Sequence, residues 1–353
     1  MATINLATKY SDKLVEKFTK ESYLAGKANQ DYDFAGVRSI TVYTIETQDL
    51  NDYSRTASAN RFGTPTEIKD TIQELVMSQD KSFSITIDKG NQSDQLYIKD
   101  AGKVMKLQLA EKNIPFMDKY ALNKWAQNAG KIAILPLPTA ANVIASLADA
   151  LTALDNALVP DDGRFIFVGA SIYNKIRMST ELLSVDPLAV KSLGRGIVGE
   201  LFGSMLVKVP DSYLGNAHFI IAHRSALLFP LKFKTLNLHT KAPGIDGALL
   251  EGRHYFDAFV LGAKADSVYV AAATANIQAV VTITATGASH ALVSTGSSHI
   301  KYTLDGSDPR FSTTAVQVAT GAAVVLTNPQ TIKAVAFHAT KFTSAVAEAT
   351  YTG

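Results

Sequence analysis

The sequence predicts two parts: an α+β body over residues 1–274 and an all-β sandwich over residues 275–353. The first observation behind this division is charge, because no Lys, Arg, Asp or Glu occurs from Ser267 to Ile300. The second is that helical and strand patterns mix before this point without a regular strand-helix repeat. The third is that short strand-like runs follow it, with Gly, Pro, Asn and Asp between them.

Composition excludes several classes of protein. The chain has 353 residues, 47% of them hydrophobic, and a formal net charge of +2. This length and apolar content can bury a sizeable core and suggest about two domains. The balanced charge, without a run of Lys or Arg, argues against nucleic-acid binding as the primary role. The absence of Cys excludes disulfides, thiolate metal sites and Cys nucleophiles, and fits folding in a reducing cytoplasm.

We expect a soluble protein without a membrane partner. The segment Met1–Asp12 has no basic stretch followed by an apolar one, so it does not resemble an export signal. The uncharged run Ile132–Ala148 contains Pro136 and Pro138, and Ser267–Ile300 is rich in Thr and Ser. Neither stretch provides the roughly 20 apolar residues that a helix needs to cross a bilayer.

The first 95 residues combine a short helix with a long, half-apolar segment. Ser11–Ala25 has the apolar spacing of an amphipathic helix. Within Val37–Gln95, residues 40–44 and 83–87 alternate like strands, whereas residues 68–76 have helical spacing. Because this segment has too few apolar residues for a core of its own, we expect it to lean on a neighbour.

The rest of the body alternates irregularly between helices and strands. Tyr97–Ala129 is predicted as a long helix, with Pro115 as a kink or break. Further helices are expected over 142–158 and 170–178, and strands over 164–168, 205–209, 218–222, 233–240, 255–261 and 267–270. In the tail, strands are expected over 279–286, 301–304, 322–326, 331–337 and 345–351.

No pattern in the sequence predicts catalysis, a cofactor or a metal. The spacing G-x-G-x-x-G occurs at Gly194–Gly199, but no convincing strand precedes it, so we interpret it as a loop. The adjacent Asp161 and Asp162 favour a turn over an acid/base pair. Asp305 and Asp308 also favour turns, with a weak cation site as the alternative. The His residues lack the spacing of metal ligands. We therefore expect a protein that is not an enzyme.

Four stretches of the body, in this order and spacing, resemble the major capsid proteins of tailed bacteriophages, which have the Hong Kong 97-type fold. They are RFGTP at 61–65 with the downstream run 79–91, VPDDGRFIFV at 159–168, GSMLVKVP at 203–210 and GRHYFDAFVL at 252–261. The resemblance extends to about Ala273.

This resemblance implies a function and a division of the body. The implied parts are an N-terminal arm over 1–36, an extended loop over 37–95, a peripheral domain over 96–130 and 227–274, and an axial domain over 131–226. The implied function is a coat protein that self-assembles as pentamers and hexamers into the icosahedral head of a phage. The head encloses DNA without sequence-specific binding. Scaffold and portal proteins are implied partners, and the implied location is the virion, after assembly in the bacterial host cytoplasm.

The extended loop supplies the candidate subunit-interface residues, which are Arg55, Arg61, Phe62, Lys81 and Lys89. Some members of the family join subunits through Lys-Asn bonds, but no acceptor for Lys81 or Lys89 is matched here. Other members begin with a scaffolding segment that a protease removes. Because this sequence begins at the arm, we expect a separate scaffold or a trimmed product.

The tail resembles immunoglobulin-like modules of the chitobiase C-terminal type. The likeness rests on YTLDGSDP at 302–309 and TIKAVA at 331–336. The turn motif consists of Tyr302, Asp305, Gly306, Asp308 and Pro309. The resemblance implies an outward-facing decoration domain, and weak contact with glycans or the host surface is the alternative role.

Three other functions stay open at the level of sequence. A bacterial compartment shell of the encapsulin type would share the fold and enclose enzyme cargo instead of DNA. A carbohydrate-active protein with an accessory sandwich would need an export signal and a cleft with two carboxylates, which the sequence does not support. A cytoplasmic binding protein would form one defined oligomer and no particles.

Overall fold

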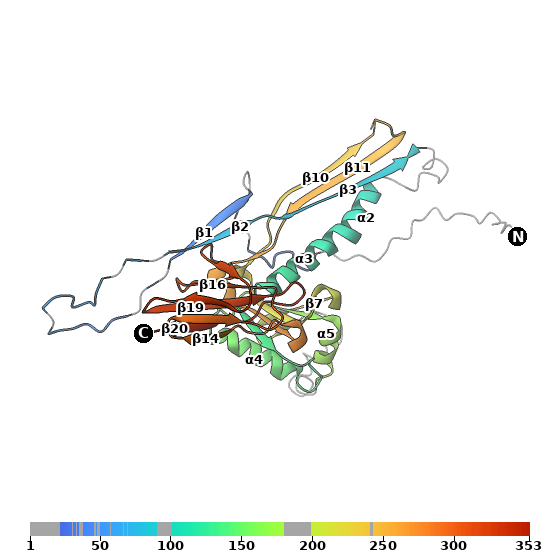
Figure 1. The fold of residues 1–353 in the computed structure, drawn as a ribbon. Helices are drawn as coiled ribbons and strands as arrows, with labels where there is room; N and C mark the ends of the chain where they lie inside the picture. Colours follow the sequence, from blue (N-terminus) through green and yellow to red (C-terminus); the bar gives the residue numbers. More distant parts are fainter. Residues whose placement is uncertain are drawn as a thin grey trace.

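The computed structural model describes residues 22–353 except 30, 33, 35–37, 46, 48, 49, 57, 66, 69, 90–100, 180–198, 241 and 242. An α+β body is followed by an all-β domain, as predicted (Figure 1). The helix expected over 11–25 lies mostly outside the described residues, as do Gly194 and Gly196 of the glycine pattern. In the described ranges, no helix is long and apolar enough to cross a membrane.

A six-stranded mixed sheet forms the centre of the body, in the order β4-β13-β8-β5-β7-β6. Its strands are β4 (Lys131–Ile134), β5 (Arg164–Gly169), β6 (Glu200–Leu201), β7 (Ser204–Val209), β8 (Ala217–His223) and β13 (Val268–Ala272). The pairs β5-β7 and β13-β4 are parallel and the others are antiparallel. β13 thus lies inside this sheet, although the sequence placed residues 227–274 in the peripheral domain and the other strands in the axial one.

Helices cover both faces of this sheet, with α3 (Ile114–Gln127) on one face and α4 (Val143–Asp155) and α5 (Ala170–Arg177) on the other. α2 (Ala101–Gln108) and the π-helical turn η1 (Leu109–Asn113) run directly into α3, so the predicted break at Pro115 is wrong. The π-helical turn that precedes Pro115 accommodates its ring and its missing N–H, so the helix continues through it.

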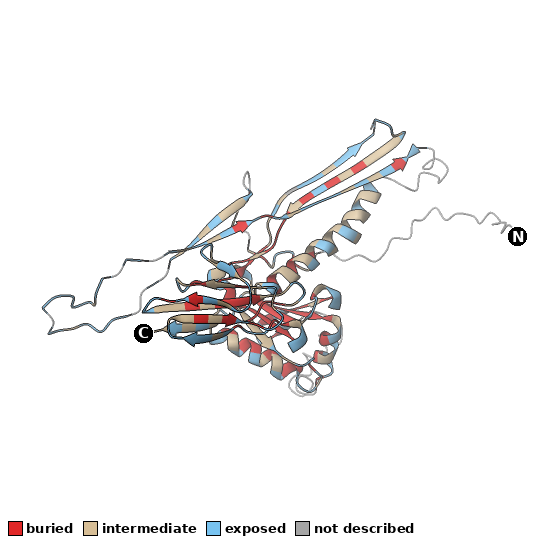
Figure 2. Cartoon of the chain, in the orientation of Figure 1, coloured by how far each residue is buried: buried red, intermediate tan, exposed pale blue. Residues whose placement is uncertain are grey.

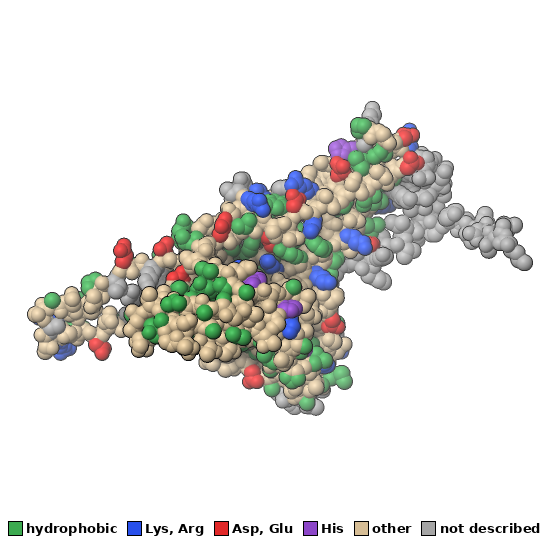
Figure 3. Space-filling model, in the orientation of Figure 1, with side chains coloured by type: hydrophobic (Ala, Val, Ile, Leu, Met, Phe, Trp, Pro, Cys, Tyr) green, Lys and Arg blue, Asp and Glu red, His purple; other side chains and the backbone are tan. Residues whose placement is uncertain are grey.

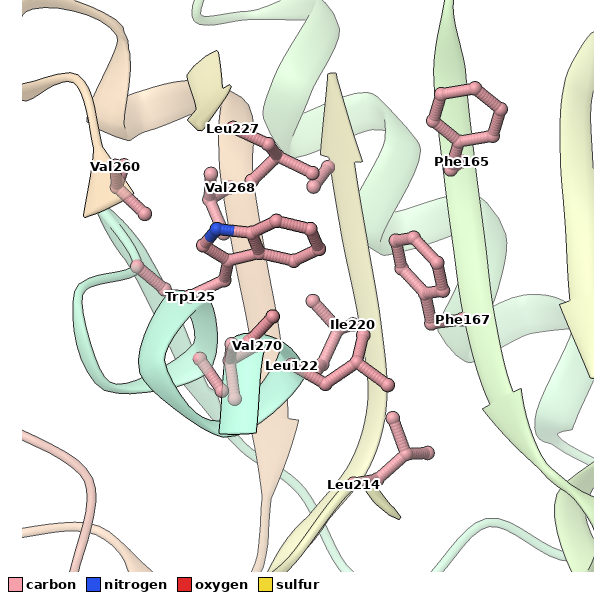
Figure 4. Packing of buried hydrophobic residues seen from close by; sticks show 14 of the residues in the cluster. Leu122, Trp125, Phe165, Phe167, Leu214, Ile220, Leu227, Val260, Val268 and Val270 are labelled. Atoms are coloured by element: carbon pink, nitrogen blue, oxygen red, sulfur yellow. The ribbon is translucent and has the colours of Figure 1, made fainter. Parts of the chain in front are cut away.

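Two hydrophobic clusters lie on opposite faces of the central sheet, because successive residues of a strand point to opposite sides. In β5, Phe165 and Phe167 join the cluster around Trp125 of α3, whereas Ile166 and Val168 join the cluster under α4 and α5. Figure 4 shows the indole of Trp125 among side chains from these strands. All six residues of β5 are buried, as expected for a strand covered on both sides.

A second sheet and a hairpin project from the body (Figure 1). The three-stranded sheet consists of β3 (Gln79–Asp88), β10 (Leu231–His239) and the central β11 (Gly247–Phe256), and α2 lies alongside it. The short pair β9 (Leu227–Leu228) and β12 (Phe259–Val260) connects it to the body. The strand expected over 255–261 is therefore interrupted, because β11 ends at Phe256.

The hairpin consists of β1 (Ser39–Ile45) and β2 (Asp70–Val76), which pair antiparallel along their full length. The helical spacing over 68–76 is therefore a wrong prediction. Thr71, Ile72 and Val76 are β-branched and favour a strand, and pairing with β1 satisfies their backbone groups. The segment 37–95 also divides, because β3 belongs to the three-stranded sheet and only the earlier part forms a loop.

The C-terminal sandwich consists of two sheets, β14-β15-β18 and β17-β16-β19-β20. Its strands are β14 (Thr282–Thr286), β15 (Ser289–Val293), β16 (His299–Thr303), β17 (Val316–Val318), β18 (Ala322–Val325), β19 (Gln330–Phe337) and β20 (Ala347–Tyr351). The sequence analysis did not predict β15 and β17. The sandwich has a hydrophobic core of its own, which includes Leu292, Ile300 and Ile332. Few charged side chains appear on the sandwich in Figure 3, as the charge-poor sequence predicts.

Candidate subunit interface

The loop between β1 and β2 exposes apolar side chains far from the body. Leu50 is fully exposed, and Phe62 and Tyr53 are 83% and 50% exposed. The rings of Tyr53 and Phe62 meet edge to face with centroids 4.9 Å apart, and the Ser54 amide donates to the Arg61 carbonyl over 3.0 Å. Figure 2 shows the loop reaching away from all other elements. Its tip is closed on itself and presents apolar surface to solvent.

One face of the hairpin continues this apolar surface. Tyr43 of β1 lies opposite Ile72 of β2, and both are exposed, as are Ile45 and Val76. A two-stranded sheet is at best marginally stable in water when nothing covers it. We therefore expect another surface to cover the apolar face of this hairpin.

The root of the hairpin is held firmly. Leu75 and Met77 are buried with Phe34, Leu228 and Leu261. The Gln73 side chain bridges to the body, since its Nε2 donates to the Val260 carbonyl over 2.9 Å and its Oε1 accepts from the Gly262 amide over 2.7 Å. The hairpin is therefore an arm that is anchored to the body at its root and exposed at its tip.

A buried carboxylate joins this root to the long helix. Oδ2 of Asp257 accepts hydrogen bonds from the Ser78 amide and hydroxyl over 2.7 and 2.8 Å, and Oδ1 accepts from the Tyr120 hydroxyl over 2.7 Å. Burial and the Asp257 carboxylate raise the pKa of Tyr120, so its hydroxyl stays a donor at every ordinary pH. The hairpin, β11 and α3 are thereby linked at one point.

The five predicted interface residues fall into two groups. Arg55, Arg61 and Phe62 lie at the exposed tip of the loop. Lys81 lies near the start of β3 and Lys89 directly after its end, so both belong to the projecting three-stranded sheet. The prediction also missed Leu50 and Tyr53, whose signal is only that they are isolated apolar residues in a polar segment.

A cavity of about 310 Å³ lies between that sheet and the helix, lined partly by Phe83, Asn113, Phe116 and His254. His254 is buried, stacks on Phe83 with centroids 6.5 Å apart, and has its Nδ1 3.2 Å from Nδ2 of Asn113. Burial lowers the pKa of His254, and the charge of Lys234 lowers it further. The sheet and the π-helical turn therefore meet at a neutral imidazole.

Because the pKa of His254 is lowered, we predict that the unassembled chain loses stability in mild acid. The unfolded chain binds a proton near pH 6.5, whereas folded His254, facing Lys81, Lys112 and Lys234, resists protonation, so stability falls as the pH drops below about 6.5. Urea unfolding at pH 7.5 and at pH 5.5 measures this difference. His254→Gln should show a smaller difference than the natural chain, and an equal difference would contradict the assignment.

The turn motif of the sandwich is closed by its own hydrogen bonds. Asp305 accepts from the Ser307 amide over 3.0 Å and from the Thr314 hydroxyl over 2.5 Å, and Gly306 has a left-handed φ of 85°. Asp308 pairs with Arg310 at 2.5 Å. Tyr302 borders the sandwich core, and Pro309 follows Asp308 in the turn. Among the described residues, no three His, Cys, Asp or Glu side chains come together as a metal site.

Comparisons with known proteins found matches for two parts of the chain. A family model described as Fn3 associated matches residues 291–351. A search of curated proteins found no match. A solved structure from Mycobacterium phage Che8 matches with a TM-score of 0.65 and 20% identity, covering 75% of this chain and 96% of that one.

Two further solved structures agree. The capsid structure of the cyanophage P-SCSP1u matches with a TM-score of 0.62 and 12% identity, covering 76% of this chain and 93% of that one. The mature capsid of bacteriophage PhiM1 matches with a TM-score of 0.59 and 12% identity, covering 77% and 92%. The body therefore has the fold of these phage capsid chains, which is the Hong Kong 97-type fold predicted from the sequence.

Proposed function

We propose that this chain is the major coat protein of a tailed phage and that its copies assemble into an icosahedral head around DNA. The observation that carries the proposal is the anchored arm with an apolar tip, on a body with the fold of phage capsid chains. Fully burying a large apolar side chain stabilises a contact by roughly 1.5–3 kcal/mol. A neighbouring copy that covers Leu50, Tyr53 and Phe62 therefore gains several kcal/mol.

The parts of the body take corresponding roles in this proposal. The hairpin with its loop, including Arg55, Arg61 and Phe62, reaches a neighbouring copy, and the three-stranded sheet with Lys81 and Lys89 forms the peripheral part. The central sheet forms the axial part around five-fold and six-fold axes, and β13 belongs to it. Scaffold and portal proteins are the further partners, and the sandwich faces outward as a decoration. The enclosed DNA needs no base-specific contact, in keeping with a net charge of +2.

The test is expression of the full chain, with a co-expressed scaffold where needed, followed by sedimentation and negative-stain microscopy. Closed particles of uniform size support the proposal. A chain that stays monomeric under all these conditions contradicts it. The contents of the particles separate the two shell functions, since enzyme cargo instead of DNA would indicate a bacterial compartment.

Two exposed side chains on the axial part support contacts between copies there. Leu158 has a left-handed φ of 56° and is 91% exposed. It directly follows the last turn of α4, where the Val159 amide donates to the Leu154 carbonyl over 3.1 Å, a position that favours glycine. Phe202 has a φ of 51° in the two-residue β6-β7 turn, where Asn or Gly is favoured, and is half-exposed. The local backbone favours neither residue, so we assign both to contacts with another copy.

This assignment predicts opposite effects on folding and assembly. Leu158→Gly and Phe202→Asn should each keep or raise the free energy of unfolding of the single chain, by up to about 1 kcal/mol, because the left-handed strain is relieved. Each should also lower the yield of particles in sedimentation. Val325→Thr, at an exposed valine of the sandwich, is the control and should change neither quantity. Normal particle yields from both variants would refute the assignment.

A further inference from the structure

Two side chains of the C-terminal domain enter the body's core, and backbone pairing within that domain holds them side by side. The Gln278 amide donates to the Phe342 carbonyl over 3.0 Å, and the Phe342 amide donates to the Asn276 carbonyl over 2.9 Å. Ile277 and Phe342 are each 5% exposed and belong to the cluster around Trp125. The core of the body is therefore completed by residues that follow its last strand.

The sandwich also supplies partners for the C-terminal end of α3. The carbonyls at such an end lack amide partners within the helix and carry partial negative charge. The Gln127 carbonyl accepts from the Thr343 hydroxyl over 2.9 Å, and the Ala129 carbonyl accepts from the Arg310 guanidinium. A hydroxyl and a cation from two loops of the sandwich thus bind the last carbonyl of α3 and a carbonyl two residues beyond it.

The turn motif holds Arg310 in position for this contact. The Arg310 side chain is 2% exposed, and its Nε and Nη2 lie 3.0 and 2.5 Å from the Asp308 carboxylate. The same carboxylate accepts from the Arg310 amide over 2.9 Å, which closes the turn around Pro309. A buried guanidinium requires such a counterion and acceptors. The turn therefore builds a docking group.

The residue after Arg310 contacts the body residue that binds the root of the hairpin. Phe311 lies against Gly262 so closely that a Cβ on Gly262 would be 2.8 Å from Cβ of Phe311. The amide of Gly262 is the one that donates to Gln73 of β2. A cavity of about 230 Å³ between Thr44, Gln73, Gly262 and Phe311 marks where the hairpin, the body and the turn meet.

From these contacts we infer that the sandwich is a brace within each copy. Its turn at 305–311 and Thr343 hold the end of α3 and the root of the β1-β2 hairpin as one unit. The brace fixes the direction in which the loop leaves the body. The inference that the sandwich braces these elements follows from the contacts alone. Only its effect on assembly rests on the proposed function. The contrasting arrangement is a decoration that hinges freely on its linker.

The test is hydrogen exchange on the full, unassembled chain with Arg310→Met and Thr343→Val. Arg310→Met should speed exchange of the amides of 128–130 and of Gly262 by about tenfold, because local opening is no longer opposed by the brace. Thr343→Val removes one hydroxyl, and should speed exchange of the amides of 128–130 by a smaller factor. The control is Lys333→Met, which removes a partly exposed cation from β19 without touching the body, and should change none of them.

Unchanged exchange at 128–130 and at Gly262 in both variants would overturn the inference. If Arg310→Met unfolds the sandwich, Thr343→Val decides, since it deletes a single contact with Gln127. Because exchange is measured before assembly, the result can be interpreted even if the chain forms no particles and the proposed function fails.

Discussion

Replacing Leu50, Tyr53 and Phe62 together by Ser is expected to abolish shell assembly while the chain stays folded. These three side chains form the exposed tip of the loop and contribute to no described core. When these three side chains are no longer buried against a neighbour, each contact between two subunits loses about 5 kcal/mol of binding free energy. The association constant of that contact then falls by about a thousandfold or more. Sedimentation measures the loss of particles, and thermal unfolding should shift by no more than a few degrees.

The matched control replaces three exposed valines of the sandwich, Val293, Val316 and Val325, by Ser. It removes apolar surface from the same number of residues at a site where we expect no copy to bind. The control should form particles at the natural yield. Particles from the loop variant at that same yield would contradict the proposed role of the tip, whatever the control does.

Replacing Arg164 by Met is expected to lower the free energy of unfolding by about 3 kcal/mol. Arg164 begins β5 with its side chain 3% exposed, and its guanidinium lies 2.6 Å from Asp155 and 2.9 Å from Asp161. Its Nε donates to the Pro160 carbonyl over 2.8 Å, and its Nη2 donates to the Val159 carbonyl. Met fills much of the volume but leaves both carbonyls without a donor. Urea unfolding of the single chain measures the difference.

Asp161→Asn provides the comparison for this prediction. The Asp161 side chain is 88% exposed, so its pair with Arg164 is screened by water and its loss should lower stability by less than 1 kcal/mol. A similar small loss for Arg164→Met would show that the buried guanidinium does not hold this loop. Asp161 and Asp162 lie in the bend and turn before β5, where the Asp162 backbone carbonyl accepts from Nε2 of His223.

Elements with strong local patterns could be predicted from the sequence, and those set by distant partners could not. The continuous apolar run of β5 and the helical apolar spacing of α4 identify both elements. Each pattern reflects which faces of the element are buried. β2 was misread because Ile72 and Val76 also fit a helical period, and only β1 decides between the two. Pro115 suggested a break, but the π-helical turn before it lets the helix continue.

The candidate surfaces were predictable only in part for the same reason. The sequence identified the loop that carries Arg55, Arg61 and Phe62, but pairing of β3 with β11 draws Lys81 into another sheet and ends next to Lys89. The turn motif at 305–309 was predicted as local turn chemistry. Its docking role was not, because Arg310 donates to a carbonyl 181 residues earlier in the chain.

The antiparallel pairing of β1 and β2 has a mechanical consequence. Tension applied at the loop draws on both strands at once, so it does not peel their hydrogen bonds apart one by one. The load passes instead to Gln73 and, through Ser78, to Asp257, which is bonded to Tyr120 on α3. In the proposed head, tension on each arm would therefore reach the subunit body through these side-chain contacts and not through the hydrogen bonds of the hairpin.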